Sequence, residues 1–190
     1  MHTLSAGERA RDTDEAELVY AAQADASAFA ELYRRYLARV YHYVRVRLND
    51  DEDAADLTQQ IFLQALDALP RYQPRGVPFA AWLFQIARHA VADLYRRRKT
   101  LATWDALPNA FELQAVPQDI EELLVQRERL ANLRELLVRL DPWQRELLAL
   151  RFAAGLSSSE IAQVVGKSHA AVKKQLTRLL YTLKERYHAQ

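Results

Sequence analysis

Cysteine is absent from the 190 residues, which excludes disulfide bonds, thiolate zinc sites and thiol catalysis. The absence suits a reducing compartment such as the cytoplasm. Only four glycines occur, and no apolar run approaches the ~20 residues that a membrane-spanning helix needs. The N-terminus lacks the apolar core of a signal peptide. We therefore expect a soluble, cytoplasmic protein without membrane insertion.

Signatures of catalysis and of metal binding are missing as well. The sequence has no HExxH motif, no glycine-rich phosphate loop and no Ser/His/Asp constellation, and its five histidines are scattered. The carboxylates within 49–53 are clustered, but they lack the ligand spacing and the central glycine of an EF-hand. We interpret them as negative charge at a helix start, where the helix dipole favours it. We expect no catalytic residue, no metal site and no cofactor.

The hydrophobic residues, half of the chain, are spaced as in helices almost throughout. Three amphipathic helices are predicted in the N-terminal half, one from Phe29, one over 54–69 and one over 79–99. A shorter helix is predicted over 15–24, after a polar lead-in at 1–13 that we expect to be flexible. The predicted fold class is therefore all-α.

Residues 100–119 break this pattern, because they contain two prolines and little periodicity. Helical periodicity then returns, and Asp141 followed by Pro142 predicts a helix start, with the cap on the aspartate and proline in the first turn. We therefore expect two helical domains, 14–99 and 120–190, joined by a flexible linker.

The stretch Leu156–Leu183 predicts two helices joined by a tight turn. Ser157 and Glu160 have the spacing of a capping box, so the first helix should begin just after Ser157. Gly166 should end it, since glycine adopts the left-handed conformation without steric cost. Ser168 can then cap the second helix.

The second helix of this pair is basic on the side opposite its apolar stripe. This arrangement is typical of a helix-turn-helix, whose second helix enters the DNA major groove. The alternative is an ordinary helical hairpin with solvated lysines. The residues on or beside the basic side are Lys173, Lys174, Gln175, Thr177 and Arg178.

A second basic cluster lies at the end of the helix predicted over 79–99. Five basic residues face one acid between Arg88 and Lys99, and aromatic residues lie close by. Arginine and lysine neutralise phosphates, and exposed aromatic rings stack on unpaired bases. The alternative is a set of C-terminal charges that complement the helix dipole, with Trp82 in the core.

Four blocks stand out, in this order along the chain: Phe29-x-x-Leu32-Tyr33-x-x-Tyr36, the run DAADLTQQIFL from Asp53, the run from Phe79 to His89 with the arginines at 96–98, and Leu156–Leu183. Together they resemble a group 4, or extracytoplasmic-function (ECF), sigma factor of bacterial RNA polymerase. The first three resemble sigma region 2 and the fourth resembles region 4, so the resemblance covers nearly the whole chain, about 15–99 and 120–187.

The resemblance implies roles for residues of each block. Core polymerase, through the clamp helices of β′, would contact Asp53, Asp56, Gln59, Gln60 and Phe62, with Phe62 serving mainly as core. The −10 element, where the strands separate, would lie near Trp82, Arg88, His89, Arg96, Arg97, Arg98 and Lys99, with the loop 71–78 forming part of a base pocket. The −35 element would face Lys173, Lys174, Gln175, Thr177 and Arg178, with Ser168 or His169 at a phosphate.

At four positions the chain departs from the family pattern. Ala55 and Gln60 replace two glutamates common in the polymerase-binding block, which removes negative charge aimed at a basic partner. His89 replaces a common asparagine near the −10 element. Gln175 replaces a common arginine in the reading helix, and glutamine can pair bidentately with adenine if it reaches the groove.

The function implied is that of a dissociable initiation factor, an alternative sigma factor that directs polymerase to promoters and helps to open them. Its partners would be core polymerase, through the β′ clamp helices and the β flap, promoter DNA and an anti-sigma factor. The alternative is a free-standing helix-turn-helix regulator that dimerises on symmetric half-sites. Nothing in residues 15–99 is needed for that alternative.

Overall fold

The computed structural model describes residues 6–74, 76–101 and 132–188, and every regular element in these ranges is helical. The all-α prediction is therefore confirmed for the described part of the chain. No helix in these ranges is long and apolar enough to cross a membrane.

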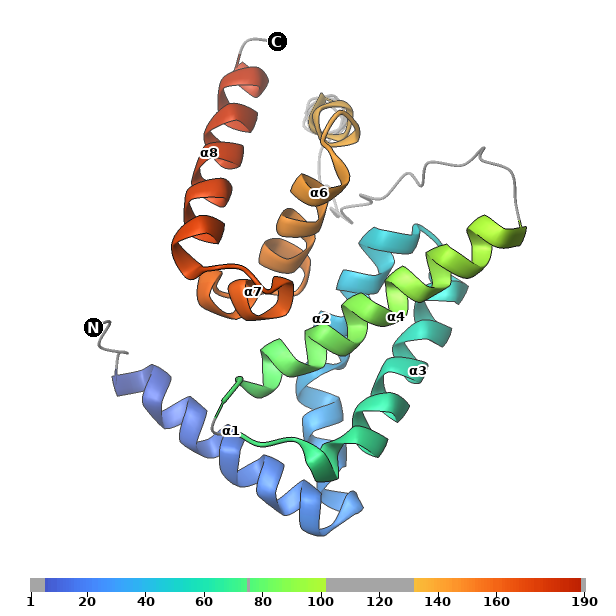
Figure 1. Ribbon diagram of the computed structural model, residues 1–190, viewed down its shortest axis with the longest axis vertical. Helices are drawn as coiled ribbons and strands as arrows, with labels where there is room; N and C mark the ends of the chain where they lie inside the picture. The colour runs from blue at the N-terminus through green and yellow to red at the C-terminus, as the bar shows by residue number, and fades with distance from the viewer. Residues whose placement is uncertain (1–5, 75, 102–131, 189–190) are drawn as a thin grey trace, which may run out of the picture.

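The N-terminal half is a bundle of four helices with two short 3-10 turns (Figure 1). Its helix α1 starts well before the expected start of a helix at Glu15, and much of the predicted lead-in 1–13 is therefore helical; residues 1–5 lie outside the described ranges. The elements are α1 (Ala6–Ala24), η1 (Ala26–Ala28), α2 (Phe29–Leu48), α3 (Asp51–Ala68), η2 (Leu69–Arg71) and α4 (Phe79–Leu101).

The C-terminal half begins, in the described part, with a helical segment over 132–138. The linker predicted at 100–119 and the helix predicted from 120 lie largely in 102–131, outside the described residues. The remaining elements are α6 (Pro142–Leu148), the π-helical turn η3 (Ala149–Ala153), α7 (Ser158–Val165) and α8 (His169–His188).

Local rules of capping place the ends of the C-terminal helices. Asp141 accepts a hydrogen bond from the backbone N–H of Gln144 at the start of α6, and Ser157 forms the expected capping box with Glu160 at the start of α7. Gly166 ends α7 with a φ of +67°, the left-handed conformation that glycine adopts without a Cβ penalty. Ser168 Oγ then accepts from the N–H of Ala171 at 3.2 Å, so its hydroxyl caps α8 as predicted.

One hydrophobic core runs through both halves of the molecule. Phe84 of α4, Leu150 of η3, and Ile161 of α7 are fully buried in the same cluster. Helix α7 lies beside α4, and η3 packs on α2 (Figure 1). A smaller cluster, made by Leu137, Leu140, Leu148 and Leu179, joins α8 to the segment before α6. The two domains expected from sequence thus pack against each other.

Candidate nucleic-acid interface

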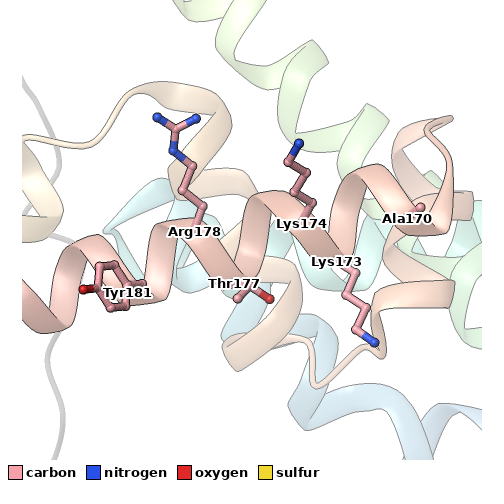
Figure 2. A pocket seen from close by; sticks show the side chains of 6 residues that line it. All are labelled: Ala170, Lys173, Lys174, Thr177, Arg178 and Tyr181. Atoms are coloured by element: carbon pink, nitrogen blue, oxygen red, sulfur yellow. The ribbon is translucent and has the colours of Figure 1, made fainter.

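Helix α8 has a buried side and a cationic side. Val172, Leu176 and Leu179 are buried, which fixes the orientation of the helix, because apolar residues at this spacing lie on one stripe. On the other side a shallow, open depression is lined by Ala170, Lys173, Lys174, Thr177, Arg178 and Tyr181 (Figure 2). Figure 2 shows Lys174 and Arg178 extending from the same side of the helix. The sequence analysis named four of these six residues, and it missed Ala170 and Tyr181.

The cations of this surface have no acidic partner within the described ranges. Lys173, Lys174 and Arg178 are exposed, and none of them forms an ion pair or a hydrogen bond with another described residue. An unpaired surface cation is available to an external anion, and the backbone of a nucleic acid offers a dense row of phosphate charges. The exposed cationic side of α8 therefore suits contact with the phosphate backbone of a nucleic acid and with the bases in the groove between the phosphates.

Gln175 lies at the edge of the α8 surface and differs from its neighbours. Its side-chain oxygen Oε1 accepts a hydrogen bond at 3.1 Å from the indole nitrogen Nε1 of Trp143, near the start of α6. Trp143 is half-buried and packs against the main core. Of the two residues predicted at the helix start, Ser168 is occupied as the cap and His169 is exposed.

The basic cluster of α4 is exposed at its C-terminal end, but its charges are largely paired. Arg96 bonds to Asp93 on the same helix, and Arg98 bonds to Asp53 of α3. Arg97 is exposed and has no described acidic partner. His89 is exposed one turn before Asp93, and the side chain of Lys99 lies outside the described part.

Trp82, predicted near the −10 element, is half-buried at the start of α4. Its ring lies 4.7 Å from that of Tyr72 and 5.4 Å from that of Phe79, centroid to centroid, so an aromatic cluster holds it. The Tyr72 hydroxyl donates to the carbonyl of Val77 at 2.6 Å and ties the loop 71–78 to the same cluster. Trp82 therefore packs on the core while part of it stays accessible, and its role near the −10 element stays a prediction.

Arg88, the remaining predicted −10 residue, faces the other half of the molecule. Its Nε lies 3.6 Å from Oε1 of Glu146, a carboxylate that is only 6% exposed. Glu146 also accepts from the Tyr43 hydroxyl at 2.8 Å and pairs with Nη1 of Arg47 at 2.9 Å. Burial and, second, the Glu146 charge raise the pKa of Tyr43 well above its ordinary value.

Sequence reasoning missed Glu146, although a signal for it exists. Glu146 stands three residues after Trp143 and four before Leu150, on the apolar stripe of a leucine-rich helix, and a charged residue at such a position is rarely buried unless it is paired. Nothing in the sequence shows that the partners come from α2 and α4.

The predicted polymerase-binding residues lie on α3. Asp56, Gln59 and Gln60 are exposed on one surface of this helix, together with Leu63, an apolar side chain that is 62% exposed. Asp53 is half-buried and pairs with Arg98. Phe62 is buried against Tyr33 and Phe29, with ring centroids 4.7 and 6.4 Å apart, which agrees with its role as core. Phe62 supports this surface from below, and Leu63 extends it.

No ligand set for a metal ion appears among the side chains that the structure describes, because no three of His, Cys, Asp or Glu converge there.

Comparison with known proteins identifies the family. Residues 32–100 match the family model of sigma-70 region 2, and residues 130–183 match that of sigma-70 region 4. The chain is 38% identical over 180 residues to the ECF RNA polymerase sigma factor BldN of Streptomyces coelicolor, covering 92% of this chain and 67% of BldN. It is 34% identical over 177 residues to the ECF RNA polymerase sigma factor SigD of Mycobacterium tuberculosis, covering 90% and 82%.

The chain belongs to the ECF RNA polymerase sigma factors. The family predicted from the four sequence blocks is thereby confirmed, and so is the function of an alternative sigma factor in transcription initiation. Sigma factors act by binding rather than by catalysis, in line with the missing catalytic signatures.

The fold of this sigma factor also matches a solved one. The structure of CnrH in complex with the cytosolic domain of CnrY has a TM-score of 0.66 and 27% sequence identity, and the match covers 93% of this chain and 98% of CnrH. A match of that extent includes both halves and their order along the chain.

Proposed function

We propose that this sigma factor divides promoter recognition between two helices, with α8 at the −35 element and α4 at the −10 element, while α3 holds core polymerase. The observation that carries the proposal is the outer side of α8, where three cations stand exposed without a described acidic partner. A helix of this kind fits the width of the DNA major groove.

On α8, phosphate contacts and base contacts would come from the same side. Lys173, at the border of the surface, suits a backbone phosphate, which fixes register without reading sequence. Lys174 and Arg178 extend from the centre, where Arg or Lys pairs with the N7 and O6 of guanine. The methyl groups of Thr177, between them, and of Ala170, one turn before Lys174, suit apolar contact with thymine.

On α4, the arginines and Trp82 would hold the separated strand. Strand separation costs unstacking, which a captured base must offset by stacking and hydrogen bonds. Trp82, half-buried and backed by the buried rings of Tyr72 and Phe79, gives such a base a rigid wall beside the loop 71–78. Arg97 and His89, both exposed, lie along the same helix for the phosphates.

On α3, core polymerase would bind the surface of Asp56, Gln59, Gln60 and Leu63. Ala55 and Gln60 stand where the family pattern has glutamates, so this surface has less negative charge for a basic partner. The exposed Leu63 offers apolar contact area in its place. We place the protein in the cytoplasm, where its polymerase partner acts.

Run-off transcription with purified core polymerase on genomic DNA tests the proposal. We expect transcripts that start at promoters sharing −35 and −10 motifs and that require both core and this protein. A free-standing helix-turn-helix regulator would instead bind symmetric sites as a dimer without core. DNA binding that needs no core, with no core-dependent start, would therefore replace the proposal with that alternative.

We also propose that an anti-sigma factor controls this protein, as the family resemblance implies. CnrH, a sigma factor of the same fold, is seen with the cytosolic domain of CnrY bound to it. The α3 surface, with its exposed Leu63, is the site at which such a protein would compete with core polymerase. Pull-down with Leu63→Asp as the variant tests this, with loss of both partners expected.

A further inference from the structure

The hydrogen bond between Trp143 and Gln175 limits which bases Gln175 of α8 can recognise. An indole nitrogen carries a hydrogen and has no lone pair to accept with, so it can only donate. The group facing it at 3.1 Å must therefore be the amide oxygen of Gln175, whatever the sequence of the bound DNA. The NH2 group of Gln175, which carries two donors, is left for an external partner.

Trp143 is placed to hold this orientation firmly. It stands at the start of α6, where Asp141 caps the helix and Pro142 occupies the first turn, so the backbone there is well fixed. Its ring is half-buried against the main core, whereas Gln175 is exposed on α8. The flexible partner is thus oriented by the rigid one.

The bases differ in what they offer to a pair of donors in the major groove. Guanine presents two acceptors, N7 and O6, whereas adenine and thymine present one each. Cytosine presents only the N4 amino group, a donor, which an NH2 group opposes. The familiar pairing of glutamine with adenine needs the amide oxygen as well, and in this protein Trp143 holds that oxygen.

We propose that Trp143 orients Gln175 as a donor-only reading group, so that this sigma factor prefers guanine, and disfavours cytosine, at one position of its −35 element. The inference rests on the proposed placement of α8 at that element. Trp143 is a positioning residue here, because it acts on DNA only through Gln175.

A selection on promoters with a randomised −35 element tests the proposal. Holoenzyme is reconstituted from core polymerase and the full-length chain, and the transcribed templates are sequenced. With the unmodified protein we expect guanine over cytosine at one position by about tenfold or more, the range for one bidentate base contact. Gln175→Ala should flatten that position alone.

The Trp143→Phe variant gives the sharper readout. It keeps an aromatic ring in the core but removes the N–H, so the amide of Gln175 can turn. We then expect adenine to rise at the same position that Gln175→Ala flattens, because the freed amide offers both an acceptor and a donor. A tryptophan that serves only to fill the core would lower thermal stability without moving the base profile.

Two controls separate this inference from the function on which it rests. Lys174→Ala and Arg178→Ala should change the −35 profile at other positions. If they do so while Gln175→Ala and Trp143→Phe leave every position unchanged, the inference fails and the placement of α8 stands. If all four leave the profile unchanged, the placement of α8 fails. A Gln175→Ala effect that is equal on all sequences identifies a phosphate contact and also overturns the inference.

Discussion

The two basic surfaces of this sigma factor differ in how their charges are held. On α8, Lys173, Lys174 and Arg178 meet no acid in the described part of the chain. On α4, Arg88, Arg96 and Arg98 each contact a carboxylate, supplied by Glu146, Asp93 and Asp53. The α8 surface can meet phosphates directly, whereas these three arginines of α4 must exchange an internal partner for an external one.

If α8 and α4 divide the promoter as proposed, this difference matches the order of events in promoter opening. Duplex contacts at a −35 element need a surface that is ready before any strand separates. Contacts to a separated strand form only after opening. An arginine that is paired with a carboxylate before that step is attracted less strongly to intact duplex DNA. Pairing on α4 thus favours late contacts over early ones.

The largest effect is expected from Glu146→Ala. The change leaves Arg47 and Arg88 without their shared carboxylate and Tyr43 without its acceptor, all at a largely buried site. Breaking a buried pair on one side costs about 3–5 kcal/mol, and the partial exposure of both arginines lowers our expectation to about 2–3 kcal/mol. Urea unfolding measures it.

The matched control for this variant is Glu135→Ala. Glu135 pairs with Arg139 one turn away on an exposed surface, so its loss should cost less than about 1 kcal/mol. Equal costs for the two variants would mean that the Glu146 cluster contributes no more than an ordinary surface pair.

A smaller effect is expected from Lys174→Ala and from Arg178→Ala. Each should lower the affinity of the holoenzyme for its promoter by roughly tenfold, since one good base contact contributes about 1–3 kcal/mol. The loss should vanish on templates whose −35 element has been scrambled. Filter binding on matched and scrambled templates measures both, and an equal loss on the two would reduce these side chains to backbone contacts.

Comparing Arg97→Ala with Arg98→Ala sharpens the contrast on α4 itself. Arg97 is unpaired in the described part, whereas Arg98 already contacts Asp53. Removing Arg97 should lower affinity a few-fold on all sequences and reduce the salt slope by about one phosphate contact. Removing Arg98 should change both less. The reverse order would mean that the pairing with Asp53 does not persist on DNA.

The last expected effect concerns pH and arises only at about pH 10 and above. The pKa of Tyr43 is raised in the folded protein, so its contribution to stability is complete below the unfolded value of about 10 and is lost as the pH rises above it. Between pH 9 and 11 the stability of the unmodified protein should therefore fall more steeply than that of Tyr43→Phe, by at most about 1.4 kcal/mol per pH unit. If the free energy of unfolding falls equally with pH in the unmodified protein and in Tyr43→Phe, Tyr43 is not a buried, neutral phenol.

Local rules account for what the sequence predicted well. Ser157, Gly166 and Ser168 act on backbone groups within a few residues, so their roles as caps can be read without knowing the fold. The buried position of Phe62 follows equally from helical spacing. The family could be recognised because each of its motifs is a run of residues within one stretch of the chain, so the motifs can be found in the sequence without knowledge of the fold.

The features that escaped prediction are contacts between distant segments. Glu146 gains its partners only when α6 packs on α2 and α4, and Gln175 meets Trp143 across 32 residues of chain. A half-buried arginine such as Arg88 has the same sequence signature whether it faces DNA or a carboxylate. Helical spacing does not depend on contacts between distant segments. The sequence therefore predicted the side of the helix on which these residues lie, but not the residues that they contact.

Arg39 of α2 shows how closely the two halves depend on each other. Its guanidinium lies over the rings of Tyr36 and Phe84, and its Nε donates to the carbonyl of Ala154 at 2.8 Å, where the π-helical turn ends. One half of the molecule therefore supplies the hydrogen-bond donor that closes a helix of the other. Without α2, the carbonyl of Ala154 would lose this donor just before Gly155, so separating the two halves would leave the end of η3, directly ahead of α7, without its cap.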